Sequence, residues 1–141
     1  MIDSESKPSV ADGRTVPDWD GGWAVMRQIR EALRCLVERR EPRQIDLRGQ
    51  PFAPGDLERL LGWLGRGEVA ATVTALGPTR VWESAIPGVW VVEHRDGEER
   101  PLALQIEVAE VPAILRSQPE DLERALALLD ERLGASSAGQ L

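Results

Sequence analysis

The sequence predicts a single α+β domain, in which a four- or five-stranded, mainly antiparallel sheet carries about three helices on one face. Three observations predict it. The chain has 141 residues with 42% hydrophobic and 29% charged residues, which is ordinary for one globular domain. Apolar residues recur with helical spacing on both sides of the chain's centre. The centre itself alternates with a period of two and is divided by short links, which is typical of an antiparallel meander.

The domain is expected to span residues 18–134. The polar residues 1–17, interrupted by Pro8, Gly13 and Pro17, predict a flexible N-terminal arm. The small and polar residues 135–141 predict a flexible C-terminal tail.

Two helices are expected before the sheet. The first is predicted from Gly22 to Glu41, and Pro42 ends it because proline disfavours helical geometry in the residue before it. The second is predicted from Pro54 to Leu64, since a proline suits a first helical turn. Gly65 is its natural C-terminal cap.

Five strands are expected. Asp96-Gly97 also indicates a tight turn before the last of them, because both residues accept positive φ angles. The alternating segments are residues 44–48, 69–76, 80–86, 89–94 and 102–108.

A final helix is expected after the sheet, preceded by a short helical turn at residues 113–116. Ser117 and Glu120 match a capping box, in which each side chain satisfies a free backbone donor. Gly134 is predicted to end this helix. Its apolar stripe consists of Leu122, Leu126, Leu129 and Leu133.

Composition argues against several functions. The 24 acidic and 17 basic residues give a net charge of −7, whereas nucleic-acid binding needs a basic surface. One cysteine (Cys35) and one histidine (His94) exclude an internal disulfide and a cysteine-rich zinc or iron–sulfur site within one chain. The sequence lacks a signal-peptide-like or membrane-spanning apolar run, so we expect a cytoplasmic protein. It predicts neither catalytic residues nor a bound metal or cofactor.

Glutamates and tryptophans of the strand region are the candidate functional residues. Glutamate is disfavoured in strands, so its repeated use there is notable. Tryptophan often anchors interfaces. A solvated acidic face and a protein-binding face both explain the glutamates, and core packing also explains the tryptophans. The candidate interaction residues are Trp82, Glu83, Trp90, Glu107 and Glu110.

Several segments in order resemble the C-terminal domain of the HupH/HyaF-type hydrogenase expression proteins. The resemblance covers roughly residues 44–134. It adds Glu68, Gly88 and Pro112 as candidate structural positions. The segments begin at Gly65 (GRGEVAA), Gly77 (GPTRVWES), Ile86 (IPGVWVVEH) and Ile106 (IEVAEVP).

The resemblance implies an accessory or chaperone protein in the maturation of [NiFe] uptake hydrogenases. Its expected partner is a hydrogenase subunit precursor, chiefly the iron–sulfur small subunit, or another maturation protein. The typical family chain is about twice as long and carries this type of domain twice. One copy makes the chain more similar to the short single-domain relatives called HupJ or HoxT.

Two other functions stay open at this stage. One is a small enzyme whose acid–base pair would be Glu83 and Glu107. The other is a metallochaperone, which one cysteine and one histidine equip poorly in a monomer. Homo-oligomerisation is also left open by the sequence.

Overall fold

The computed structural model describes residues 9–11, 14–16, 20–74 and 77–139. The chain divides into two compact units, residues 1–110 and 111–141, and each is described by itself. Among the described residues they contain a five-stranded antiparallel sheet and three α-helices, which confirms the predicted α+β class.

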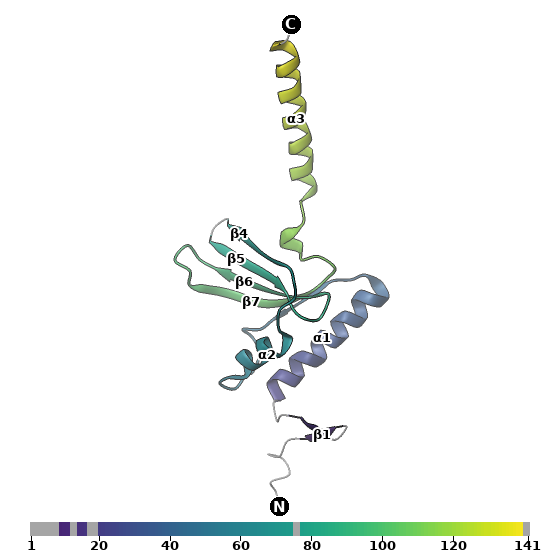
Figure 1. Ribbon diagram of the computed structural model, residues 1–141, viewed down its shortest axis with the longest axis vertical. Helices are drawn as coiled ribbons and strands as arrows, with labels where there is room; N and C mark the ends of the chain where they lie inside the picture. The colour runs from purple at the N-terminus through teal and green to yellow at the C-terminus, as the bar shows by residue number, and fades with distance from the viewer. Residues whose placement is uncertain (1–8, 12–13, 17–19, 75–76, 140–141) are drawn as a thin grey trace, which may run out of the picture. The chain divides into compact units, whose positions relative to one another are not determined.

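Two helices of the first unit pack on one face of its sheet (Figure 1). Helix α1 (Asp20–Arg39) begins and ends two residues before the predicted bounds, and its stripe of Val25, Ile29 and Leu36 is buried. Helix α2 (Asp56–Leu64) begins two residues after Pro54. The predicted cap is present, since Gly65 has φ 66° and donates its N–H to the Leu61 carbonyl.

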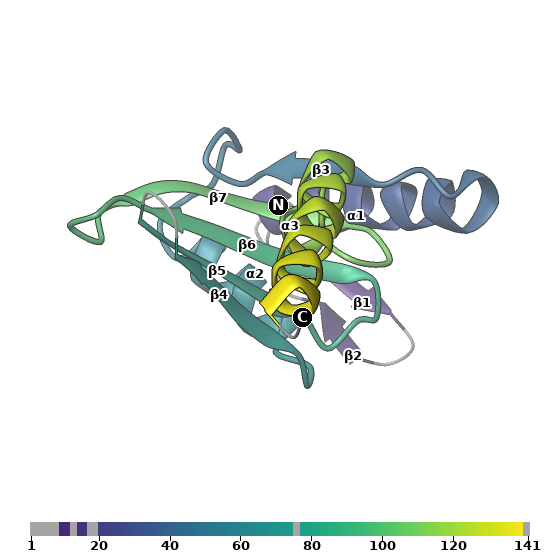
Figure 2. The ribbon, with the colours of Figure 1, turned by 90° about the horizontal axis from the view of Figure 1, so that it is seen from above.

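The main sheet has the order β3-β7-β6-β5-β4, and every neighbouring pair is antiparallel (Figure 2). The last four strands in sequence form the predicted meander. The first strand, β3, lies at the far edge beside β7, which the sequence did not predict. The strands are β3 (Arg43–Asp46), β4 (Ala70–Thr74), β5 (Pro78–Glu83), β6 (Val89–Arg95) and β7 (Pro101–Val108).

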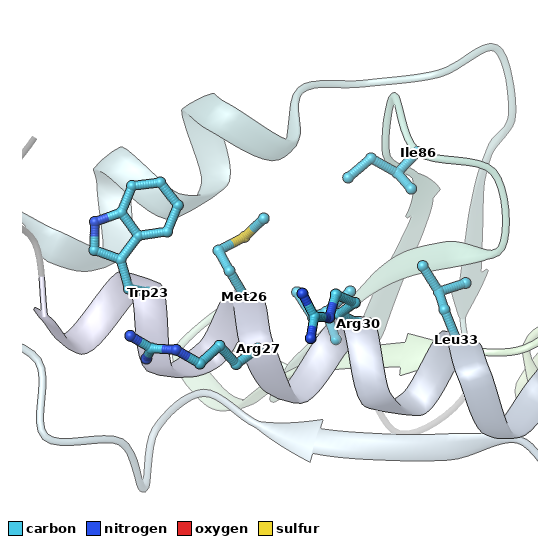
Figure 3. Close-up of a pocket in the computed structure, with 7 residues that line it drawn as sticks. Trp23, Met26, Arg27, Arg30, Leu33 and Ile86 are labelled. Atoms are coloured by element: carbon cyan, nitrogen blue, oxygen red, sulfur yellow. The ribbon is translucent and has the colours of Figure 1, made fainter. Parts of the chain in front are cut away.

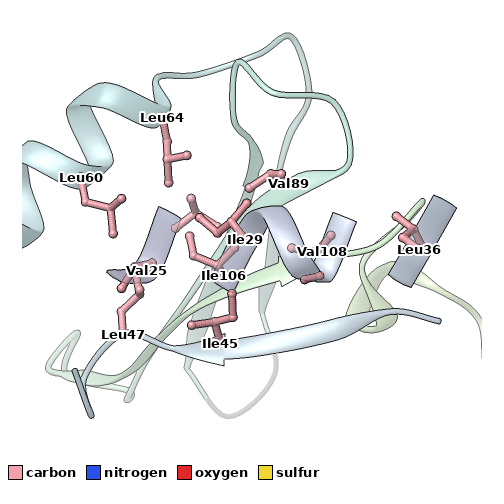
Figure 4. Packing of buried hydrophobic residues seen from close by; sticks show 12 residues of the cluster. Val25, Ile29, Leu36, Ile45, Leu47, Leu60, Leu64, Val89, Ile106 and Val108 are labelled. Atoms are coloured by element: carbon pink, nitrogen blue, oxygen red, sulfur yellow. The ribbon is translucent and has the colours of Figure 1, made fainter. Parts of the chain in front are cut away.

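The core lies between this sheet and the two helices (Figure 4). Strand register aligns Ile45, Ile106, Val91 and Trp82 in one transverse row, and directly opposed residues share a face. All four belong to or pack against the buried cluster that includes Leu60 and the α1 stripe. The faces of the sheet are therefore assigned by register.

Two turns set the ends of β6. Between β5 and β6, Gly88 has φ 83°, and the Ser84 N–H is donated to the Val89 carbonyl over 2.9 Å. Between β6 and β7, the positive φ belongs to Glu99, at 62°, and not to Gly97. The predicted Asp-Gly turn is therefore wrong in detail, because the loop is longer and Asp96 accepts the backbone N–H of Arg100.

The second unit contains a short 3₁₀ helix, η2 (Ala113–Leu115), and helix α3 (Pro119–Gly139). The predicted stop at Gly134 is wrong, because an exposed glycine inside a helix costs only about 1 kcal/mol and does not by itself end it. The described part of the predicted tail, residues 135–139, is thus helical. Helix α3 also begins with Pro119 as its first residue, and the Gln118 carbonyl accepts the Leu122 N–H.

The predicted N-terminal arm contains a small hairpin, β1 (Ser9–Ala11) paired antiparallel with β2 (Arg14–Val16). The rest of the arm lies outside the described residues. None of the helices described here combines the length and hydropathy that crossing a membrane requires.

Candidate functional site

Three of the five candidate interaction residues lie side by side in the sheet. Register pairs Glu83 with Trp90 and Trp90 with Glu107, so the indole stands between two glutamates on neighbouring strands. Trp90 adjoins Val91 in sequence, and successive strand residues point to opposite faces. The row therefore lies on the sheet face away from α1 and α2. The sequence named these residues, but only the register brings them together.

This face is closed to solvent at its centre. Glu107 is 4% exposed and Trp90 is 6% exposed, while Val81 and Val92 are each 1% exposed. The Trp90 indole N–H donates to the Ala109 carbonyl over 3.1 Å, which satisfies its one polar group. Trp90 and Glu107 are thus packed inside the fold, and Glu83 is the partly exposed member of the row. The face is consequently not an open, solvated acidic surface.

Trp82 lies on the other face, beside the helices. Its ring packs against the core, and the Arg66 guanidinium carbon stands 4.3 Å from the ring centroid. This geometry is a cation–π contact. Trp82 and Trp90 therefore do not form one aromatic patch.

Glu110 follows β7 and is exposed. Its carboxylate accepts a hydrogen bond from Arg40 over 3.0 Å, at the end of α1. Both side chains are largely exposed, so the pair contributes at most about 1 kcal/mol to stability. Glu110 is therefore an exposed charged residue just after the end of β7.

The three candidate structural positions differ in setting. Gly88 occupies the left-handed region in the β5–β6 turn, where its carbonyl accepts the Ala109 N–H over 3.0 Å. Pro112 is buried, and Glu68 is exposed before β4. The motif containing Gly88 is thus explained by a turn that joins β6 to the end of β7.

The described residues do not bring together three side chains of the metal-binding types His, Cys, Asp and Glu. Cys35 is buried in α1, where Arg39 donates to its sulfur over 3.1 Å. His94 Nδ1 is 2.9 Å from the Thr79 hydroxyl oxygen on the neighbouring strand. Glu83 and Glu107 stand two strand spacings apart, about 10 Å between backbones, with Trp90 between them.

An apolar groove beside α1 was missed by the sequence analysis. Its volume is about 340 Å³, and it is lined by α1 and by Ile86 of the β5–β6 turn. Met26 and Leu33 pack against the core, yet both remain partly exposed. The sequence carried no separate signal for the groove, because the apolar periodicity of the helix is the same for residues that face the core and residues that line a groove.

Comparisons with known proteins agree with the resemblance. The family model described as "HupH hydrogenase expression protein, C-terminal conserved region" matches residues 21–136. The hydrogenase expression/formation protein HupQ of Azotobacter chroococcum mcd 1 is 31% identical over 144 residues, covering 92% of this chain and 50% of the relative. The hydrogenase expression/formation protein HoxQ of Azotobacter vinelandii is 38% identical over 93 residues, covering 66% and 32%.

A solved structure is also similar. The hydrogenase expression protein HupH from Thiobacillus denitrificans ATCC 25259 matches with a TM-score of 0.76 and 38% identity, over 81% of this chain and 95% of that one. The chain spans half or less of the length of the two curated relatives, but nearly all of the solved chain.

Proposed function

Since the chain belongs to the family of the HupH hydrogenase expression protein C-terminal region, we propose that it is a non-enzymatic accessory protein in [NiFe] uptake hydrogenase maturation. It acts in the cytoplasm by binding a hydrogenase subunit precursor or another maturation protein. Among the precursors, the iron–sulfur small subunit is the favoured candidate. The observation that carries this proposal is the family match over residues 21–136, together with relatives whose names state hydrogenase expression or formation.

The arrangement of the titratable groups supports binding over catalysis. A general acid–base pair needs two carboxyl groups that both reach the reacting atoms of one bound substrate. Glu107 is buried, and Trp90 separates it from Glu83. The acidic candidates that reach solvent are Glu83, which is partly exposed, and Glu110, which is exposed. Acidic groups at the rim of an interface chiefly steer the partner.

The test is affinity purification of the tagged protein from a host induced for hydrogenase synthesis. We expect a hydrogenase structural subunit precursor or a hydrogenase maturation protein to co-purify. Deleting the gene should lower hydrogenase activity, and the unmodified gene should restore it. Normal activity in the deletion strain, together with no hydrogenase-pathway protein in the eluate, would overturn the proposal.

Charge-reversing variants test the surface assignment separately. Glu83→Lys and Glu110→Lys should lower partner recovery, because both side chains reach solvent. Glu58→Lys makes the same charge change at an exposed site on α2 and serves as the matched control. Equal recovery with all three variants would show that the acidic positions do not form the contact.

A further inference from the structure

The groove beside α1 differs from the rest of this acidic protein in both hydropathy and charge. Its apolar lining comes from Trp23, Met26 and Leu33 of α1 and from Ile86 (Figure 3). Ile29, which is 2% exposed, also lines it. From Trp23 to Leu33 the lining extends along about three turns of α1, or roughly 15 Å. Its volume of about 340 Å³ is within the range of binding pockets.

Two arginines of α1, Arg27 and Arg30, line the same groove and are exposed. Neither forms an ion pair with any acidic side chain that the structure describes. The neighbouring arginines do: Arg34 pairs with Glu31 at 3.4 Å and Arg39 with Glu41 at 3.2 Å. In a chain with a net charge of −7, the groove thus concentrates positive charge that lacks a described counter-charge.

The wall of the groove favours a helical ligand over an extended one. Along α1 the backbone N–H and C=O groups are used within the helix, so this wall offers no strand edge for β-augmentation. Trp23, Met26 and Leu33 lie along one flank of α1 at helical spacing. A partner helix with apolar residues at positions i, i+3 or i+4, and i+7 fits such a flank, as in helix-in-groove recognition.

We propose that this groove binds an amphipathic helix of a partner protein, with apolar side chains in the groove and carboxylates on Arg27 and Arg30. This inference rests on the proposed function and deepens it by naming the element through which a partner is recognised. The acidic candidates Glu83 and Glu110 do not take part in it. Complementary charge selects the partner, and the buried apolar side chains supply most of the affinity.

The test uses the full chain and designed peptides of about 16 residues, because helices shorter than about 12–15 residues are marginal in water. The acidic peptide has leucines at helical spacing flanked by glutamates. A second peptide replaces the glutamates by lysines, and a third replaces the leucines by serines. Binding is measured by fluorescence anisotropy of the labelled peptides at low and high salt.

We expect the unmodified protein to bind the acidic peptide about tenfold more tightly than the lysine peptide, with a preference that falls at high salt. The double variant Arg27→Glu/Arg30→Glu should reverse this order. Arg34→Glu, on the same helix outside the groove, should leave it unchanged. The serine peptide should not bind. Amide chemical shift changes should be confined to α1 and the Ile86 turn.

Equal binding of the two charged peptides, binding of the serine peptide, or no binding at millimolar concentrations would overturn the groove assignment. So would self-association of the protein that the double variant abolishes, because the occupant would then be a second copy. None of these four results affects the recovery of hydrogenase-pathway proteins in the purification experiment. A failed groove and a failed function are therefore distinguishable.

Discussion

Replacing Trp90 by alanine should damage the fold before it damages any interface. The side chain is 6% exposed and stands between Glu83 and Glu107 in the sheet. Truncating a buried tryptophan to alanine costs about 3–5 kcal/mol. The Ala109 carbonyl also loses the indole donor at 3.1 Å, which adds about 1 kcal/mol. A cost of about 4–6 kcal/mol is a large share of the 5–15 kcal/mol that stabilises a typical domain.

The assay is urea unfolding followed by far-ultraviolet circular dichroism, since tryptophan fluorescence changes with the substitution itself. Trp90→Phe keeps a ring but loses the hydrogen bond, so it should cost only about 1–2 kcal/mol. Trp63→Ala is the matched control, because that side chain is 54% exposed on α2 and should cost about 0.5 kcal/mol. At roughly 3–5 °C per kcal/mol, a cost of about 4–6 kcal/mol means that Trp90→Ala should lower Tm by about 12–30 °C.

The reasoning is refuted if Trp90→Ala costs no more than Trp63→Ala. If the expected order holds, loss of partner recovery in Trp90→Ala reports unfolding and not a missing contact. Trp90→Phe is then the variant with which a direct role of this residue in binding is tested.

Two further predictions concern the turns that flank the sheet. Gly77 has φ 138°, and a Cβ there would lie 2.3 Å from the Arg95 carbonyl oxygen, so Gly77→Ala should cost more than about 2 kcal/mol in urea unfolding. Gly62→Ala, where a Cβ meets nothing within 4 Å in helix α2, should instead stabilise the protein by up to about 1 kcal/mol, and a similar cost at both sites would contradict the argument. In the β6–β7 loop, hydrogen bonds to its carboxylate hold the pKa of Asp96 below its ordinary value of 3.8. The main donor is the backbone N–H of Arg100, followed by the Arg100 side chain and the backbone N–H of Glu98. A carboxylate whose pKa is lower in the folded state than in the unfolded state stabilises the fold at pH values above its unfolded-state pKa. This stabilisation is lost as the pH falls through the folded-state pKa. Asp96→Asn should therefore lower the urea midpoint at neutral pH. The difference from the unmodified protein should shrink below about pH 3.8, and a difference independent of pH would show that the charge of Asp96 does not matter.

The setting of a single side chain depends on strand register, which the local pattern does not contain. Alternation showed that Trp82 and Glu83 point to opposite faces, but the face that meets the helices was not decided by alternation alone. Register decides it, because Trp82 opposes Val91 and Glu83 opposes Trp90. The two explanations of the strand glutamates, a solvated face and a protein-binding face, both need side chains that reach solvent, yet Glu107 is buried beside that tryptophan.

The local pattern by itself determined the α+β class, the meander and the approximate bounds of α1 and α2. Side-chain period, proline and glycine signals act over a few residues, so they can be read without knowing the fold. The tertiary structure alone decided that β3 joins the sheet beside β7, that Trp90 is buried, and that Arg27 and Arg30 face a groove without a described counter-charge. These features depend on which apolar faces meet across long stretches of chain. The free energy of that choice comes from burial shared between distant residues, which no local window contains.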